Sequence, residues 1–200
     1  MTALRTIPVT PFTGAAPCTI RAERASDVAG REALLDACFG EDRDARTCQR
    51  LRDGRAPAEG LAFSAVCQRR LAGTIRLWHV SAGGVAALVL GPLAVDPSCR
   101  KLGIGRALVN HALAAAKARG HGAVILLGDA PYYARFGFSA LKTGELSLPG
   151  PFERDRLLGL ELREGVLDGA WGMIAPTETA ARQSKPRIAA RLRKSAPHAA

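Results

Sequence analysis

The sequence has little that would place this chain outside ordinary globular proteins. Its five cysteines are odd in number and form no C-x-x-C pair, so we expect reduced thiols, without a zinc site or a disulfide framework. The longest uncharged stretch, residues 80–95, contains three glycines and a proline, so it is too short and too broken to span a bilayer. No basic-then-apolar signal segment opens the sequence. These absences predict a cytoplasmic protein with no membrane span and no metal.

Aromatic residues are also scarce, at 5%, and they do not alternate with basic residues as on a nucleic-acid surface. Apolar residues make up 48% of the 200 residues and charged residues 23%, which excludes a fully disordered chain, a collagen-like fibre and a coiled coil. A single core at this length buries about 70% of the unfolded surface. We therefore expect one domain over residues 18–175, preceded by a flexible leader over residues 1–17.

The net charge of +10 is distributed unevenly. Residues 176–200 carry six basic residues and one acidic residue, so this short segment holds half of the excess. We expect a basic, disordered tail there, for which solvation is the commoner outcome and contact with nucleic acid or anionic lipid the rarer one. The remainder is mildly basic, as suits a protein that holds an anionic ligand.

Hydrophobic patterning predicts a mixed sheet flanked by helices. The expected strands are 19–22, 61–67, 71–80, 86–95, 123–127, 157–162 and 171–175, and the expected helices are 28–39, 42–51, 104–119 and 132–135. Ser26 or Asp27 is expected to cap the first helix. Gly91-Pro92 inside the strand 86–95 predicts a bulge, or a point where this strand leaves its neighbour.

A glycine-bearing turn between strand 86–95 and helix 104–119 has the composition of an anion site. The first N–H groups of a helix lack partners inside the helix, and the helix dipole adds a partial positive charge there. Two glycines leave these donors open, and three basic residues surround them, so we expect the turn to hold a pyrophosphate. The residues expected to contact it are Arg100, Lys101, Leu102, Gly103, Ile104, Gly105 and Arg106. The plainer alternative is an ordinary helix start that contains two glycines.

Two other phosphate motifs do not fit this turn. The P-loop pattern G-x-x-x-x-G-K-[ST] is absent, so no lysine and hydroxyl are placed for a nucleotide and magnesium. The dinucleotide fingerprint G-x-G-x-x-G fails at its last position, which is Leu108. The pattern that remains is Arg-x-x-Gly-x-Gly after a strand.

Arg100, Gly103 and Gly105 match the [RQ]-x-x-G-x-[GA] motif, and residues 133–138 match a second motif, Tyr-x-x-x-Gly-Phe. On these two motifs the chain resembles the GCN5-related N-acetyltransferase (GNAT) superfamily over roughly residues 20–175, and residues 127–138 resemble a little-characterised bacterial branch of it. The resemblance implies an α/β fold with a mixed, largely antiparallel sheet, a splayed central strand and flanking helices.

By the same resemblance, the expected activity is direct transfer of an acetyl group from acetyl-CoA, a co-substrate, to a primary amine. The resemblance implies that Leu93 and Val95 line the pantetheine arm and that Tyr133 protonates the departing thiolate, with Tyr132 the lesser candidate. Packing of Tyr133 against the sheet is the structural alternative. A homodimer through edge strands is also an expectation from the family.

No general base stands out in the sequence. His79 is a candidate to face the site, whereas His111 fits core packing or the helix surface. Asp129 follows a strand but suits a cap or turn equally well. Cys99 adjoins the anion turn and is expected to be structural or incidental.

Two other classes of function stay open at this stage. One is a non-catalytic acyl-CoA-binding sensor or regulatory module, and the other is a nucleic-acid-associated protein that binds through its basic tail. The acceptor would be set by residues around 43–58, by the hairpin 61–80 and by the last strands, none of which carries a recognisable signature.

Overall fold

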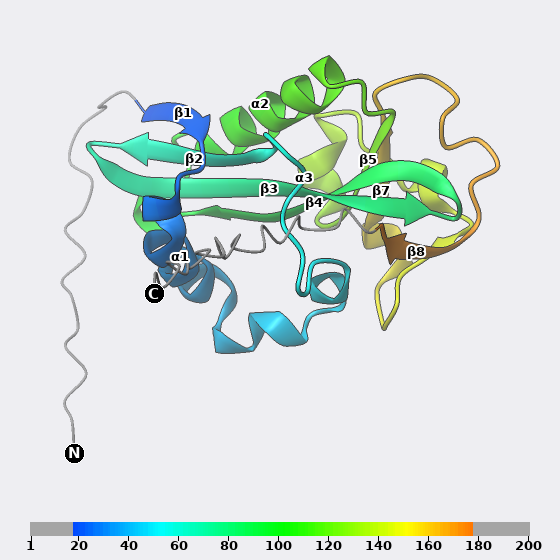
Figure 1. Cartoon of the computed structure of the whole chain (residues 1–200), viewed down its shortest axis with the longest axis horizontal. Coiled ribbons are helices and arrows are strands. Elements are labelled where there is room, and N and C mark those ends of the chain that lie inside the picture. The colour runs from blue at the N-terminus through cyan, green and yellow to red at the C-terminus, as the bar shows by residue number, and fades with distance from the viewer. Residues whose placement is uncertain (1–17, 178–200) are drawn as a thin grey trace, which may run out of the picture.

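A computed structural model describes residues 18–177 of this chain (Figure 1). The leader predicted for residues 1–17 and nearly all of the tail predicted for residues 176–200 lie outside the described residues. Within that range the strands are β1 (Cys18–Ala22), β2 (Ala62–Cys67), β3 (Arg70–Ala82), β4 (Val85–Val95), β5 (Ala123–Leu127), β6 (Leu146–Ser147), β7 (Leu157–Glu161) and β8 (Gly172–Pro176). The α-helices are α1 (Val28–Phe39), α2 (Ile104–Ala118) and α3 (Ala130–Ala134).

The strands form one mixed sheet in the order β1-β2-β3-β4-β5-β7, with β8 pairing with β3 and also with the short β6. Only β4–β5 and β6–β8 are parallel pairs, so the sheet is largely antiparallel. In Figure 1, α2 lies along one side of the strands and α1 along the other. The predicted mixed sheet with flanking helices is confirmed.

Alternate residues of the central strands pack on opposite faces of the sheet, as the two-residue period of a strand requires. In β5, Val124 and Leu126 belong to the core that includes α2, whereas Ala123 and Ile125 belong to the core on the opposite face. A third small cluster joins α1 to the sheet through residues 34–35. Both faces of β5 are therefore buried, which explains why its sequence is an uninterrupted apolar run.

The central strand β4 carries the irregularity that Gly91-Pro92 predicts. Leu77 of β3 pairs with Leu90, but Ile75 pairs with Leu93, so the cis-linked pair Gly91-Pro92 opposes a single residue of β3. Gly91 has a φ of 139°, a conformation that favours glycine. This bulge bends β4 at its midpoint.

Beyond the bulge, β4 separates from β5. The two strands pair only at Leu88 with Val124 and at Val89 with Ile125, so residues 90–95 have no ladder with β5. The splayed central strand that the resemblance implies is confirmed, and it leaves one backbone edge of β4 open next to β5.

One sequence-based expectation about the segment after α1 is wrong. Residues 42–51 do not form one helix; they form two 3-10 segments, Glu41–Ala45 and Thr47–Leu51. Arg46 between them is extended, with φ −70° and ψ 143°. Arg43 is instead drawn back to α1, where it bonds Glu32 at 2.5 Å and Asp36 at 2.6 Å. These ion pairs hold the segment close to α1, and the extended Arg46 interrupts what would otherwise be one helix.

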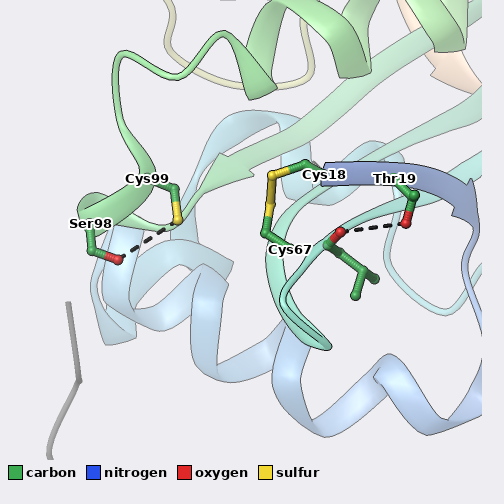
Figure 2. The surroundings of a disulfide bond; sticks show 6 residues. Cys18, Thr19, Cys67, Ser98 and Cys99 are labelled. Carbon is green, nitrogen blue, oxygen red and sulfur yellow. Dashed lines mark hydrogen bonds between the residues drawn. A yellow bond between two sulfur atoms is a disulfide. The ribbon is translucent and has the colours of Figure 1, made fainter. Parts of the chain in front are cut away.

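The expectation that every cysteine is reduced is also wrong. Cys18 and Cys67 are joined by a disulfide between β1 and β2 (Figure 2). The two residues face each other in the strand register, although 49 positions separate them in the sequence. Of the other cysteines, Cys99 is buried near this disulfide in Figure 2, and Cys38 and Cys48 are half-buried free thiols.

Asp27 precedes α1, but its side chain does not cap that helix. Its carboxylate accepts two hydrogen bonds from Arg21, at 2.6 and 2.8 Å, and one from Ser64 Oγ at 3.0 Å. It also accepts the backbone N–H of Arg24 at 2.9 Å, which caps the 3-10 turn Ala25–Asp27 before α1. Asp27 therefore fastens the start of α1 to β1 and β2.

Replacing Asp27 with asparagine is expected to lower the free energy of unfolding by about 2 kcal/mol at neutral pH, because Arg21 loses its charged partner. Hydrogen bonds from Arg21 hold the pKa of Asp27 well below its usual range. A lowered carboxylate pKa stabilises the fold above the unfolded-state value of about 4, and this stabilisation is lost as the pH falls through the folded-state pKa. Urea unfolding should thus show a D27N deficit near pH 7 that shrinks in strong acid. An equal deficit at every pH would contradict this role.

Candidate functional site

The turn from β4 into α2 has an open set of backbone donors. Gly103 precedes α2 in a left-handed conformation with φ 77°, and Lys101 also has a positive φ, 69°. The first bond of the helical ladder runs from the N–H of Ala107 to the carbonyl of Gly103, at 2.9 Å. The N–H groups of residues 104–106 precede that bond, so they are available to an anion at the positive end of α2.

Gly105 stands at the tightest point of this turn. A Cβ added there would lie 2.9 Å from the hydroxyl of Tyr132 and 3.5 Å from Cγ2 of Val95. A side chain at this position would therefore crowd the Tyr132 hydroxyl of α3, next to the free N–H groups of the turn. Gly103 has no heavy atom near its missing Cβ, so its requirement for glycine comes from φ alone.

The basic residues of the turn are on the surface. Arg100, Lys101 and Arg106 are exposed, and Leu102 is 61% exposed, so these four side chains surround the turn without packing into the core. Ile104 is the exception, because its side chain is buried beneath α2 and only its backbone faces outward. A small cavity of about 390 Å³ lies further along α2. It is lined by Arg106, Asn110, Pro131, Arg135 and Phe136.

Tyr132 lies beside the turn at Gly105 and is not among the residues of the cavity that Tyr133 lines. Its hydroxyl lies over Gly105, its ring stacks beneath the Arg135 guanidinium at 4.9 Å, and burial raises its pKa. Sequence reasoning did not assign Tyr132 to the anion turn. The residue is 27 positions from Gly105 in the chain, and no local pattern signals their approach.

The open edge of β4 presents backbone groups toward β5. The N–H of Asp96 donates to the carbonyl of Ala72 in β3, at 2.9 Å. Because backbone groups alternate in direction along a strand, the N–H groups of Leu93 and Val95 point away from β3, into the splay. The carbonyl of Val95 accepts a bond from Cys38 Sγ of α1, at 3.4 Å. Leu93 and Val95 thus lie between the anion turn and the cavity described next.

A cavity of about 660 Å³ adjoins the bulged half of β4. Its walls come from β4, the end of β5, α3, the residues after α1 and residues 151–156. The residues that matter for its chemistry are Phe39, Arg43, Arg46, Arg52, Gly91, Leu93, Asp129, Tyr133, Phe152, Glu153 and Arg156. The cavity is therefore lined by apolar and aromatic side chains together with four arginines and two carboxylates.

Tyr133 is the phenol on the wall of this cavity. Its ring packs so closely on Gly128 that a Cβ there would overlap it, and it meets the ring of Phe138 edge-on at 5.7 Å. Burial raises the pKa of Tyr133 well above its usual range, so the hydroxyl stays protonated at neutral pH. The structure thus brings Tyr133, Leu93 and the bulge to one cavity.

The remaining sequence candidates lie elsewhere. His79 faces His121, with 5.4 Å between ring centroids, and does not line the cavity; His111 packs edge-on against Phe63 at 4.6 Å. Asp129 does line the cavity, but its carboxylate also accepts the N–H of Tyr132 at 3.1 Å and so begins α3.

Cys99 is fully buried, and burial raises the pKa of its thiol. In the described part of the chain, no three His, Cys, Asp or Glu side chains gather so as to hold a metal ion. No helix between residues 18 and 177 is long and apolar enough to cross a membrane.

Comparison with known proteins places this geometry in a family. Residues 58–140, from before β2 through the turn and α3, match the acetyltransferase (GNAT) domain. The uncharacterized N-acetyltransferase YhbS of Escherichia coli (strain K12) is 30% identical over 157 residues, which are 78% of this chain and 93% of that protein.

Solved structures agree with the sequence match. The crystal structure of E. coli YhbS in complex with CoA superposes with a TM-score of 0.71 at 28% identity, covering 83% of this chain and 93% of that one. A GNAT family acetyltransferase from Brucella melitensis in complex with acetyl-CoA gives 0.62 at 26% identity, covering 82% and 97%. With its splayed β4, its glycine turn and these relatives, the chain belongs to the GNAT acetyltransferase superfamily.

Proposed function

We propose that this protein is an acetyl-CoA-dependent N-acetyltransferase that moves an acetyl group directly to a primary amine. The observation that carries the proposal is one continuous path: the turn at Gly103–Gly105, then the open edge of β4, then the cavity with Tyr133. A donor with a pyrophosphate, an extended arm and a reactive thioester has the same order of parts. Two relatives with 26–28% identity were crystallised with CoA or acetyl-CoA.

The turn would hold the diphosphate. The N–H groups of residues 104–106 and the charges of Arg100, Lys101 and Arg106 supply donors and counter-charge, and the missing side chain of Gly105 keeps the approach open. The outward N–H groups of Leu93 and Val95 would pair with amides of the pantetheine arm, as an added strand does. The small cavity beside Arg106 and Arg135 offers further positive charge to the rest of the nucleotide.

The chemistry would occur where β4 meets the cavity. A backbone N–H in the splay, that of Leu93, would polarise the thioester carbonyl. The protonated hydroxyl of Tyr133 would donate its proton to the departing thiolate. The carbon–nitrogen bond forms as the carbon–sulfur bond breaks. The amine loses one proton to solvent, and solvent returns one proton to the Tyr133 oxygen, so Tyr133 is regenerated and no further reactant is needed.

Two measurements on the full chain test this function. Isothermal titration with acetyl-CoA should show one binding site, and thiol release over a panel of amines should show turnover with at least one of them. Binding without thiol release from any amine would reject the enzyme and favour the non-catalytic acyl-CoA sensor. Absence of acetyl-CoA binding would reject both.

A further inference from the structure

The lining of the cavity carries an excess of positive charge. Four arginines line it, whereas only two carboxylates do, those of Asp129 and Glu153. The arginines are Arg43, Arg46, Arg52 and Arg156. Three of them come from the segment directly after α1, which the two 3-10 turns fold against the bulge of β4.

Two of these arginines already have carboxylate partners. Arg43 bonds Glu32 and Asp36 of α1, which fixes the fold of its own segment. Arg156 lies 3.3 Å from Glu153, so this exposed pair largely cancels its own charge. Neither arginine needs a ligand to balance it.

Arg52 has no such partner. Its Nε donates to the carbonyl of Cys48 at 3.2 Å, and none of the carboxylates in residues 18–177 forms an ion pair with its guanidinium. Burial lowers the pKa of Arg52, although the group stays charged at any physiological pH. A Cβ added to Gly91 would lie 3.7 Å from Nη1 of Arg52, so the guanidinium sits beside the bulge and next to the reaction position proposed above.

Among the four cavity arginines, Arg46 is the second that forms no ion pair with a carboxylate of residues 18–177. Its Nη2 donates to the carbonyl of Phe39 at 3.1 Å, and its guanidinium covers the Phe39 ring at 5.1 Å. Arg46 is exposed, whereas Arg52 is half-buried. A partly desolvated guanidinium without a counter-ion is unfavourable, and a bound anion would relieve that cost with paired N–H donors.

We propose that the acceptor is a small amine that also carries a carboxylate or a phosphate, and that Arg52, assisted by Arg46, binds this anionic group. This proposal rests on the proposed function and deepens it by naming the substrate class. With its anion at Arg52, the acceptor directs its amine toward Leu93 and Tyr133, which line the same cavity. The apolar residues of the lining accommodate the methylene groups between the two ends.

Matched pairs of amines test the proposal on the full chain by thiol release with acetyl-CoA. β-Alanine is compared with β-alaninamide, and phosphoethanolamine with ethanolamine, so that the carboxylate and phosphate arms are separated. At least one anionic member should exceed its neutral counterpart in kcat/KM by about 10-fold or more. Replacing Arg52 with methionine should lower kcat/KM for that member by roughly 10- to 100-fold, and for its counterpart by less than about 3-fold.

Controls separate recognition from folding. Arg55→Met removes an exposed arginine that does not line the cavity, and should leave both members of each pair unchanged. Arg52→Lys retains the charge without the paired donors and should recover part of the preference. The acetyl-CoA Kd should be the same in the wild type, Arg52→Met, Arg52→Lys and Arg55→Met.

Three outcomes would overturn the inference. A preference for the neutral amines, with turnover present, would remove the anion site but leave the N-acetyltransferase function standing. Equal losses for both members in Arg52→Met, or a raised acetyl-CoA Kd, would assign Arg52 to structure or to donor binding. Acetyl-CoA binding with no thiol release from any amine would reject the proposed function, and this inference with it.

Discussion

Replacing Gly105 with valine is expected to weaken acetyl-CoA binding by about 30-fold or more, equivalent to roughly 2 kcal/mol. The reason is geometric. Even a Cβ at this position would lie 2.9 Å from the Tyr132 hydroxyl, and valine adds two more methyl groups to the first turn of α2, whose N–H groups would hold the diphosphate. Those donors lose access to the diphosphate, and a charge-assisted hydrogen bond is worth more than a neutral one. Titration of purified G105V with acetyl-CoA measures the effect.

Gly144→Val is the matched control for this substitution. Gly144 has an ordinary φ of −53° and nothing within 4 Å of its missing Cβ, so valine fits there. G144V should bind acetyl-CoA as the wild type does. Comparing the double variant G105V/Y132F with Y132F alone separates two causes: removing the hydroxyl relieves the contact with α3 but not the blocked donors, so the double variant should still bind more weakly than Y132F. Unimpaired binding in folded G105V would remove the turn from the donor site.

Much of the arrangement around this turn could be predicted because the determinants are local in the sequence. The proline within an otherwise apolar strand marks the bulge at Gly91-Pro92, and the structure places the register shift there. Likewise α2 begins at Ile104, directly after Gly103, which has a positive φ. Lys101, two residues before Gly103, has a positive φ as well. Turn-forming residues and apolar periodicity act over a few neighbouring residues, so their effect can be predicted from a single sequence without knowledge of tertiary contacts.

Features that depend on contacts between distant segments could not be predicted in the same way. The Cys18–Cys67 disulfide follows from the register of β1 on β2, and an odd count of widely spaced cysteines gave no indication of it. The two 3-10 turns after α1 depend on the ion pairs of Arg43, which compete with helix formation. The two-residue β6 is too short to carry a periodic signal.

The same limit applies to the candidate site. Tyr132 reaches Gly105, and Arg52 reaches Gly91, only because α3 and the segment after α1 converge on β4. The motif residues predict the donor end of the site, whereas the acceptor end is assembled from segments without a motif. This division explains why the family is evident from the sequence and the acceptor is not.

Replacing Tyr133 with phenylalanine is expected to lower kcat by roughly 100-fold while the acetyl-CoA Kd changes by less than about 2-fold. The ring keeps its packing on Gly128 and Phe138, so only the proton donor to the leaving thiolate is lost. Because burial raises the pKa of Tyr133, the donor stays protonated as the pH rises through 7 to 9, and wild-type kcat should show no decline from its ionisation there. Thiol release with the best amine of the panel, followed across that range, measures both effects.

Tyr132→Phe is the control that makes this result specific to one hydroxyl. Tyr132 is adjacent in α3 and equally a phenol, but its hydroxyl lies over Gly105 at the diphosphate end. Y132F should therefore keep kcat within about 3-fold and change mainly the affinity for acetyl-CoA. If Y133F turns over normally, or if Y132F shows the greater loss of kcat, the proton donor is not Tyr133. Protonation of the thiolate then falls to Tyr132 or to solvent, and Tyr133 serves only as part of the cavity wall.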